Sequence, residues 1–427
     1  MYSMRSKKFL FFLADIFLFY LALFITLTIR YGSVPSKEFW FLHFWPFAII
    51  YLLWIIIFYI AGLYDIEKFI SIRELRNRIF KTMAMAGLLA VVLFYLVPFF
   101  NITPKTNLVM DGIIVWLLIW TWRGILFDSA VKSSKIKIFF LGDDKEINEF
   151  AQLINGRPQM GYETVSNINQ SDIIVISKES KQNSDAVRSL YEFIRSGKTV
   201  IDFDKFYELV TGKIPVSLVG KTWFLENLLE INKQTFEKTK RAFDVVFALI
   251  LFIIFAISYP FIALAIKINS QGPVFYRQKR FGKNGKLFEI IKFRSMVFNA
   301  EKNGAEWAKK DDIRITFVGN LLRKTRLDEL PQILNVLKGD LSFVGPRPER
   351  PEFVKELEKQ IPHYSMRHLI KPGLSGWAQI NFPYGASVED TVEKLQYDLY
   401  YIKNRSLLLE IAIILKTIMT ILSRSGR

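Results

Sequence analysis

Cysteine is absent from the 427-residue sequence, and histidine occurs only three times. The missing thiols exclude disulfides, thiolate metal sites and catalytic cysteines, although they do not indicate a cellular compartment. His43, His363 and His368 are isolated residues that lack the spacing of metal ligands, so we assign them no chemistry. The reactive groups of this chain therefore have to be sought among its other polar residues.

Acidic residues are also scarce relative to basic ones. The chain has 40 Asp and Glu against 57 Lys and Arg, which gives a formal net charge of +17. Cationic loops beside membrane spans explain part of this excess, and the rest favours an anionic partner. Because hydrophobic residues make up 51% of the chain, acidic lipid headgroups and phosphorylated substrates are better candidates than nucleic acid. We predict no nucleic-acid partner.

The apolar residues must be concentrated in segments, since 23% of the chain is charged. This pattern is typical of a membrane protein with soluble parts. A length of 427 residues also exceeds the roughly 250–300 at which single cores stop growing, so we expect more than one domain. We place the domains at residues 1–130, 131–235 and 236–427.

Four apolar stretches predict a membrane-embedded helical bundle in the first domain. They cover about residues 9–29, 39–63, 83–100 and 108–122, against the roughly 20 residues that a spanning helix needs. Lys and Arg cluster at residues 5–8, 68–81 and 123–137. The positive-inside rule therefore places the N-terminus and the rest of the chain in the cytoplasm. Asp15 and Asp111 fall inside these stretches, and we favour structural over functional roles for both.

The middle domain is predicted to be a cytoplasmic α/β unit that resembles half of a doubly wound, Rossmann-like sheet. Apolar and β-branched runs at 136–141, 172–177 and 199–203 supply its strands. The turn Gly142-Asp143-Asp144 lacks the glycines that a dinucleotide pyrophosphate needs, and its carboxylates would repel one, so we predict no NAD there. A regulatory nucleotide site is one interpretation. We favour a packing or oligomerisation module without a ligand, which makes this domain a candidate homodimer contact.

The apolar segment at about 242–266 is long enough to cross a bilayer, yet both of its flanks are basic. A full crossing would leave the cations of the C-terminal domain outside the cell. Pro260 removes a backbone hydrogen bond, so we expect a sharp break there, with Ser258 available for a freed carbonyl. We predict a re-entrant helix that enters and leaves on the cytoplasmic face. An ordinary fifth span is the alternative.

Two adjacent acids, Asp328 and Glu329, lie among leucines and isoleucines that recur at helical spacing. Pro331 suits a helix that starts near Leu327, where free N–H groups and the helix dipole stabilise an anion. Neighbours on a helix diverge by about 100°, so the two carboxylates can take different roles. Complementation of the helix dipole alone is the plainer interpretation of such a pair.

Four ordered motifs favour a catalytic interpretation. They read KFRSM at 292–296, RKTRLDELPQ at 323–332, LKGDLSFVGPRP at 337–348 and KPGLSGWAQIN at 371–381. Over about residues 240–427 the chain resembles the polyprenyl-phosphate hexose 1-phosphate transferases of the monotopic phosphoglycosyl transferase superfamily. With its apolar stretches and middle domain, it further resembles the long members that initiate exopolysaccharide, capsule or O-antigen repeat units at the bacterial plasma membrane. The resemblance implies a mixed α/β, helix-rich catalytic domain with a re-entrant membrane helix.

The resemblance also implies a role for each matched residue. Asp328 would be the nucleophile, Glu329 a ligand of Mg²⁺, Arg323 and Arg347 phosphate-binding residues, and Lys292 and Arg294 active-site cations. The implied reaction moves a hexose 1-phosphate from a nucleotide-diphosphate sugar, UDP-hexose by default, to polyprenyl (undecaprenyl) phosphate through a covalent aspartyl-phosphosugar intermediate. One departure is visible, because the family often has Ser directly before the re-entrant proline, where this chain has Tyr259.

Other residues receive structural predictions. Pro372 and Gly373 are expected in a turn, and Trp377 as an anchor in the core or at an interface. Asp340 and Asp398 could assist metal or base chemistry, but we favour solvated structural acids. The competing functions are a membrane scaffold with a degenerate transferase domain and a nucleotide-sugar oxidoreductase. The intact acidic pair counts against the first, and the missing glycine fingerprint against the second.

Overall fold

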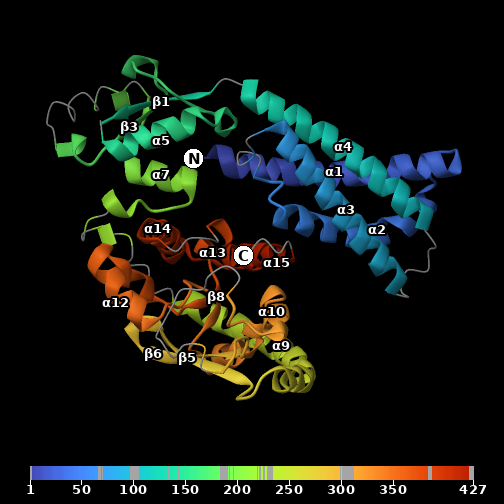
Figure 1. Cartoon of the computed structure of the whole chain (residues 1–427). Coiled ribbons are helices and arrows are strands. Elements are labelled where there is room, and N and C mark those ends of the chain that lie inside the picture. The colour runs from blue at the N-terminus through green and yellow to red at the C-terminus, as the bar shows by residue number, and fades with distance from the viewer. Residues whose placement is uncertain are drawn as a thin grey trace. The chain divides into compact units, whose positions relative to one another are not determined.

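The computed structural model separates into two compact units, Met1–Phe203 and Asp204–Arg427. It describes residues 2–65, 69, 71–96, 105–132, 135–142, 144–182, 191, 193–195, 197–218, 220, 223–224, 227, 234–298, 300, 312–382 and 387–422. Figure 1 colours the first unit from blue to green and the second from green to red. Each unit is described on its own.

Four helices begin the N-terminal unit (Figure 1). They are α1 (Tyr2–Tyr31), α2 (Lys37–Ile60), α3 (Ile72–Leu96) and α4 (Lys105–Lys132). Among the described residues, α1, α2, α4 and α9 (Gln234–Asn269) of the other unit are long and apolar enough to cross a membrane. The third predicted stretch lies on α3, and its last residues, 97–100, are outside the described ones. These helices are consistent with a multi-pass membrane protein.

Two buried carboxylates tie α4 to its neighbours inside this bundle. Asp15 of α1 pairs with Arg123 of α4 at 2.6 Å, and both side chains are almost fully buried. Asp111 accepts a hydrogen bond from the Tyr51 hydroxyl of α2 at 2.9 Å. Each acid therefore joins two helices, which agrees with the structural roles favoured for both.

A parallel sheet of four strands follows α4, in the order β2-β1-β3-β4. Its strands are β1 (Ile136–Leu141), β2 (Tyr162–Thr164), β3 (Ile173–Ile176) and β4 (Thr199–Asp202). The three predicted runs all form strands, and β2 is an addition. α5 (Lys145–Asn155) links β1 to β2, and 3-10 turns lie at Pro158–Met160, Ile168–Gln170 and Ser180–Gln182.

The carboxyl ends of β1 and β3 approach closely. Gly142 follows β1 with a φ of +146°, and a side chain at this position would strike Ser177, which follows β3. Glycine is therefore needed here for packing between the strands. The next residue of the predicted turn, Asp143, lies outside the described residues.

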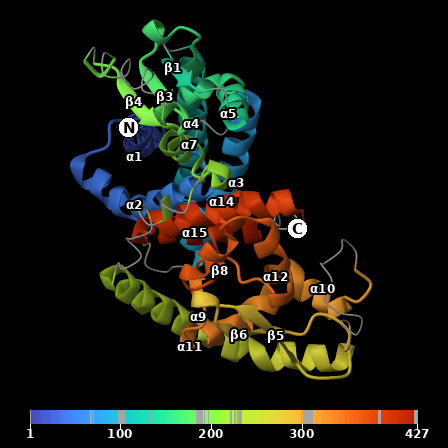
Figure 2. The same ribbon diagram turned by 90° about the vertical axis from the view of Figure 1, so that its left-hand side faces the viewer.

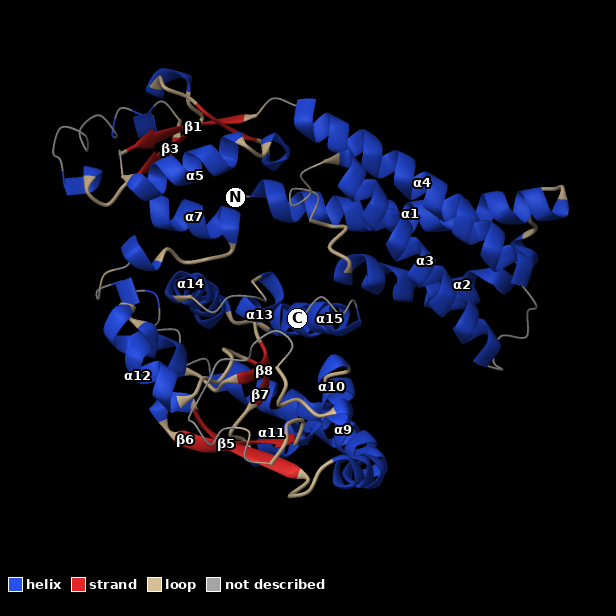
Figure 3. Cartoon of the chain, in the orientation of Figure 1, coloured by secondary structure: helices blue, strands red, loops and turns tan. Residues whose placement is uncertain are grey.

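The C-terminal unit is rich in helices and contains two small sheets, which Figure 3 shows in red. β5 (Phe275–Phe281) pairs antiparallel with β6 (Leu287–Phe293), and β7 (Ser342–Val344) pairs parallel with β8 (Gly373–Ser375). The helices are α7 (Phe203–Thr211), which begins at the boundary, α9, α10 (Phe317–Lys324), α11 (Ile333–Lys338), α12 (Pro351–Gln360), α13 (Trp377–Asn381), α14 (Val388–Asn404) and α15 (Leu407–Leu422). The 3-10 turns are Val216–Leu218, Lys283–Gly285, η8 (Leu327–Gln332) and η9 (Tyr364–Leu369).

The long helix α9 runs beside β5, β6 and α11 (Figure 2). It is assigned as one helix of 36 residues, so it does not end at Pro260. The Tyr259 ring stacks on Phe275 of β5 at 5.6 Å, which holds this part of the helix against the hairpin. Ser258 Oγ donates to Phe255 O at 3.2 Å. The carbonyl that loses its helical donor because of Pro260 belongs to the next residue, Ala256, so this hydrogen bond of Ser258 does not replace the missing one.

Candidate active site

The two acids Asp328 and Glu329 lie on η8, a 3-10 turn between α10 and α11. Arg326 precedes the turn with a φ of 59°, in the left-handed region, and thereby turns the chain out of α10. Pro331 stands inside the turn. The helical start expected at Leu327 is therefore present, as a 3-10 turn that leads into α11.

Three cations face the carboxylate of Glu329. Lys292 Nζ, near the end of β6, donates to Oε1 at 2.8 Å, and Arg347 Nη2 donates to the same oxygen at 3.3 Å. Arg326 Nη1 lies 3.7 Å from Oε2. Burial alone would raise the pKa of Glu329, but Lys292, Arg347 and Arg326 hold it well below its usual range. Glu329 is therefore a carboxylate at neutral pH.

Asp328 is more buried and has fewer partners. It is 8% exposed, and its Oδ1 accepts no hydrogen bond from any residue that the structure describes. Burial, together with the charge of Glu329, raises the pKa of Asp328, and Lys292, Arg323 and Arg326 oppose this shift. A buried carboxylate oxygen without a donor is poorly stabilised in the resting site, which makes it available to a substrate or a metal ion.

The other predicted cations have different surroundings. Arg323, in the last turn of α10, donates from Nε to Ser295 Oγ at 2.8 Å, and its charge acts on Asp328. Arg294 is buried, and its guanidinium donates to Gln271 O at 2.6 Å and Ser270 O at 2.7 Å, just beyond α9. The fold thus gathers Lys292, Arg323 and Arg347 around the acidic pair, whereas the described contacts of Arg294 are to the loop after α9.

Arg347 is presented by the loop after β7, where two backbone segments cross in close contact. Gly345 N donates to Ser375 O at 2.8 Å, and Gly373 N donates to Pro346 O at 2.9 Å. A side chain on either glycine would strike the backbone of the other segment. Gly373 begins β8, so the turn predicted at this residue is wrong. Pairing with a distant strand has overridden the local turn preference.

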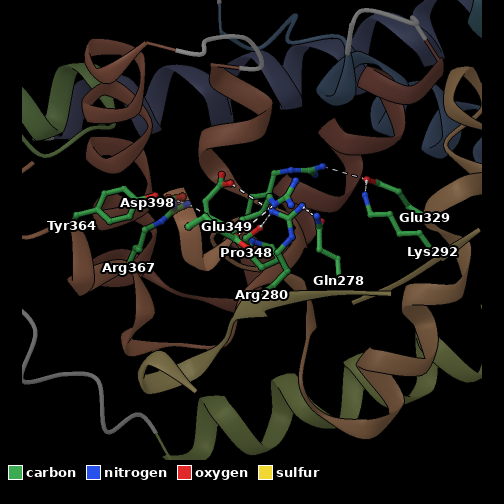
Figure 4. A network of polar contacts seen from close by, with 12 residues as sticks. Gln278, Arg280, Lys292, Glu329, Pro348, Glu349, Tyr364, Arg367 and Asp398 are labelled. Atoms are coloured by element: carbon green, nitrogen blue, oxygen red, sulfur yellow. Dashed lines mark hydrogen bonds and ion pairs between the residues drawn. The ribbon is translucent and has the colours of Figure 1, made fainter. Parts of the chain in front are cut away.

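Two arginines that the sequence did not indicate hold this loop in place. Arg367 of η9 donates to Arg347 O at 3.1 Å, and Arg280 of β5 donates to Pro348 O at 3.2 Å. Figure 4 shows both guanidiniums beside the segment that follows β7. No local pattern marks them, because their role depends on contacts between distant segments. Arg326 was also missed, although its charge is visible in the run RKTR, which Leu327 separates from the acidic pair.

Two structural predictions have clear outcomes. Asp398 is 1% exposed and pairs with Arg367 at 2.8 Å, so the expectation of a solvated acid is wrong. Burial raises the pKa of Asp398 to about 6, because the loss of water outweighs the attraction of Arg367. Trp377 stacks on Tyr400 at 5.7 Å and donates from Nε1 to Gly212 O at 2.9 Å, which confirms it as an anchor.

The donor set fits a magnesium ion. Mg²⁺ prefers oxygen ligands and is usually held by one or two carboxylates together with substrate phosphates and water. Glu329 and the unpartnered Oδ1 of Asp328 supply such oxygens. Within the described part of the chain, no three His, Asp or Glu side chains gather into a metal cluster. A magnesium ion here would therefore take the rest of its ligands from the substrate and from water.

Comparison with known proteins points to one family. Residues 235–424 match the family model for bacterial sugar transferases. The chain is 48% identical over 187 residues to a UDP-N-acetylgalactosamine-undecaprenyl-phosphate N-acetylgalactosaminephosphotransferase of Aeromonas hydrophila, which is 44% of either chain. It is 43% identical over 183 residues to a UDP-glucose:undecaprenyl-phosphate glucose-1-phosphate transferase of Escherichia coli, covering 42% of this chain and 39% of that one.

A relative in Caulobacter vibrioides, also named UDP-glucose:undecaprenyl-phosphate glucose-1-phosphate transferase, is 40% identical over 186 residues. This match covers 43% of the present chain and 70% of the relative. The chain spans less than half the length of the Aeromonas and Escherichia relatives that it matches. The residues matched by the family model lie in the C-terminal part, which contains the acidic pair.

Proposed function

Because this chain belongs to the bacterial sugar transferase family, we propose that it transfers a hexose 1-phosphate from a nucleotide-diphosphate sugar to polyprenyl phosphate. Relatives are named for UDP-sugars and undecaprenyl phosphate, so these are the first substrates to test. One observation carries the proposal: a buried carboxylate with an unpartnered oxygen lies beside a second carboxylate that three cations surround. Such a site can neutralise a diphosphate and attack it.

Asp328 is the nucleophile of the first half-reaction in this proposal. Its carboxylate oxygen forms a bond to the sugar-linked phosphorus, and the bond from that phosphorus to the bridging oxygen breaks. The electron pair leaves on the nucleoside monophosphate, and an aspartyl-phosphosugar remains. The raised pKa of Asp328, caused by burial and by Glu329, describes a more basic and therefore more nucleophilic carboxylate.

The remaining residues bind and orient. When bound at Glu329, Mg²⁺ would supply neutralisation of the diphosphate charge. Arg323 and Arg347 hold phosphate oxygens, and Lys292 keeps Glu329 ionised and in place through its hydrogen bond of 2.8 Å. Arg294 acts indirectly, because it fixes the loop after α9 through two carbonyl groups.

The polyprenyl phosphate reacts in the second half-reaction. One of its phosphate oxygens attacks the same phosphorus, the Asp328 carboxylate leaves, and the lipid-linked product carries the sugar 1-phosphate. We propose that α9 is a re-entrant membrane helix, which bends at Ser258 and Pro260 while it remains one helix. Its outer face is apolar and exposed, as at Ile257 and Phe261. A shallow helix of this kind would keep the acidic pair at the depth of the carrier's phosphate.

The proposed location is the bacterial plasma membrane, with the catalytic unit on the cytoplasmic face, where the transfer starts a repeat unit of exopolysaccharide, capsule or O-antigen. The chain has no cysteine, so a single Lys359→Cys on α12 can report its side of the membrane. Labelling from outside intact cells would refute the re-entrant course. We propose that the parallel sheet is a Rossmann-like packing module and homodimer contact. A monomer in light-scattering measurements would argue against that contact.

The proposed function is tested with a panel of nucleotide sugars and the full chain in detergent. We expect one sugar to give magnesium-dependent release of nucleoside monophosphate. Without polyprenyl phosphate, about one equivalent should be released per chain, and turnover should continue when the acceptor is added, because the mechanism is ping-pong. Absence of release from every sugar, in protein whose chain is folded and membrane-inserted, would refute the proposal.

A further inference from the structure

Glu329 is surrounded by more positive charge than it can neutralise. Oε1 faces Lys292 Nζ at 2.8 Å and Arg347 Nη2 at 3.3 Å, while Arg326 Nη1 lies 3.7 Å from Oε2. A divalent ion would have to bind to these same oxygens. An ion that arrives alone meets three cations, and their repulsion opposes its binding.

The two guanidiniums are the cations best placed to change partner. The Arg347 side chain is 42% exposed and that of Arg326 is 36% exposed, against 20% for Lys292. Arg326 also stands between α10 and η8, with its backbone in the left-handed conformation. A long side chain with a solvated end can turn to a new partner without disturbing the core.

A diphosphate supplies the partners that a metal ion would displace. Once a divalent ion occupies the Glu329 oxygens, the displaced guanidiniums need other anions. Phosphate oxygens suit them, because the planar guanidinium donates two parallel hydrogen bonds to such a group. A metal ion that arrives together with a diphosphate brings the phosphate oxygens that the displaced guanidiniums need, whereas a metal ion alone does not.

We infer that Arg326 is a counter-ion that exchanges partners: it faces Glu329 Oε2 in the resting site and passes to the diphosphate when a divalent cation binds. The metal ion and the nucleoside diphosphate then bind as one unit, with positive coupling between them. The diphosphate part of this inference rests on the proposed function. The competition between Arg326 and a metal ion does not, since it follows from the contacts of Glu329 alone.

The test measures Mn²⁺ binding to the full chain in detergent by electron paramagnetic resonance, with and without UDP. Titrations without protein correct for the complex of Mn²⁺ with UDP. In the wild type, UDP should tighten Mn²⁺ binding about tenfold or more. Arg326→Gly removes the charge and tolerates the left-handed backbone. This variant should bind free Mn²⁺ about five- to tenfold more tightly than the wild type and lose most of the coupling.

Two further variants separate charge from backbone. Arg326→Lys keeps a cation but cannot donate two parallel hydrogen bonds, so its affinity for free Mn²⁺ should stay within about threefold of the wild type, while part of the coupling is lost. Lys324→Gln is the matched control, because it removes an exposed cation from the neighbouring last turn of α10, and it should leave Mn²⁺ affinity within about twofold.

The inference is overturned if Arg326→Gly binds free Mn²⁺ no more tightly than the wild type. It is also overturned if UDP binds to the wild type and leaves its Mn²⁺ affinity unchanged. A wild-type chain that binds no UDP and releases no nucleoside monophosphate would instead count against the proposed function. The comparison in free Mn²⁺ would still decide the role of Arg326 in that case.

Discussion

Asp398 and Glu329 are both carboxylates paired with arginine in the C-terminal unit, and their surroundings differ in charge balance. Figure 4 shows them at opposite ends of one series of polar contacts. Asp398 has Arg367 as its partner at 2.8 Å, and the two side chains are 2% and 6% exposed. Glu329 faces three cations whose side chains are 20%, 36% and 42% exposed. Asp398 and Arg367 form a matched cluster, in which one buried cation pairs with one buried anion. Glu329 and its three cations form an open cluster, which has surplus positive charge next to water.

This difference distinguishes an ion pair that fixes the fold from a cluster that can bind an anion. A buried one-to-one pair cannot change partner without leaving a lone charge, so it fixes the segments that carry it. Surplus cations beside solvent attract an anion, and their side chains can move to contact it. The two clusters are connected, because Arg367 also donates to Arg347 O at 3.1 Å. The matched cluster therefore positions one of the cations that the open cluster uses.

The largest expected effect is the loss of chemistry in the open cluster. Asp328→Asn removes the carboxylate that would form the bond to phosphorus, while shape and burial stay nearly the same. Turnover should fall by about a thousandfold or more, and no covalent sugar-phosphate adduct should form. Release of nucleoside monophosphate and the intact mass of the chain after reaction with substrate measure the two effects.

A matched control makes this test specific. Asp340→Asn is the same change at an acid that pairs with the exposed Lys338 at 3.2 Å, and it should keep turnover within about twofold. Normal turnover by Asp328→Asn would remove the nucleophile from the proposal. It would also mean that the charge imbalance around Glu329 does not mark the reacting group.

The next effect concerns stability in the matched cluster. Arg367→Met leaves Asp398 buried without its partner, which should cost about 3–5 kcal/mol. Hydrogen exchange of the amides in α14, which carries Asp398, measures this loss locally. The apparent KM for the nucleotide sugar should also rise, because the loop that presents Arg347 loses one of its hydrogen bonds.

Two variants test whether the lone charge is the cause. The double variant Arg367→Met, Asp398→Leu removes both charges of the pair. Part of the lost hydrogen-exchange protection of α14 should therefore return. Lys359→Met breaks a surface ion pair between Lys359 and Glu356, whose side chains are 71% and 65% exposed respectively. It should change the protection of α14 little. If Arg367→Met leaves the exchange of α14 unchanged, the matched cluster does not hold this helix.

Local patterns predicted much of the fold. The strands β1, β3 and β4 were found from apolar runs, because β-branched and aromatic residues favour strands. β2 was missed, since Tyr162–Thr164 is only 3 residues long and has no pattern of its own. α9 continues past Pro260, where stacking of Tyr259 on Phe275 helps to hold the chain in place. Such tertiary contacts cannot be read from one segment.

The candidate site was predictable to the extent that it is local. Asp328, Glu329 and Arg323 lie close together in one motif, so their proximity follows from the sequence. The direction of a side chain does not, and Arg294 turns toward the carbonyls after α9. The left-handed backbone of Arg326 does not follow from the sequence either, because glycine and asparagine are the usual residues in that conformation.

The smallest expected effect is a change in pH dependence, and it tests whether the surplus cations act on the nucleophile. Asp328 attacks as a carboxylate, and burial and Glu329 raise its pKa, so kcat/KM should rise with pH as this proton is lost. Lys292 is one of the charges that lower the pKa of Asp328. Lys292→Met should therefore raise that pKa further and move the acidic limb of the profile to higher pH.

The ratio of kcat/KM at about pH 5.5 to that at about pH 8 should then be about three- to tenfold smaller in Lys292→Met than in the wild type. A ratio separates this effect from any uniform loss of substrate binding. Lys286→Met, in the exposed turn of the β5–β6 hairpin, removes the same charge and should leave the ratio unchanged. Equal ratios in all three proteins would mean that Lys292 acts on Glu329 alone, and that the cations of the open cluster bind without tuning Asp328.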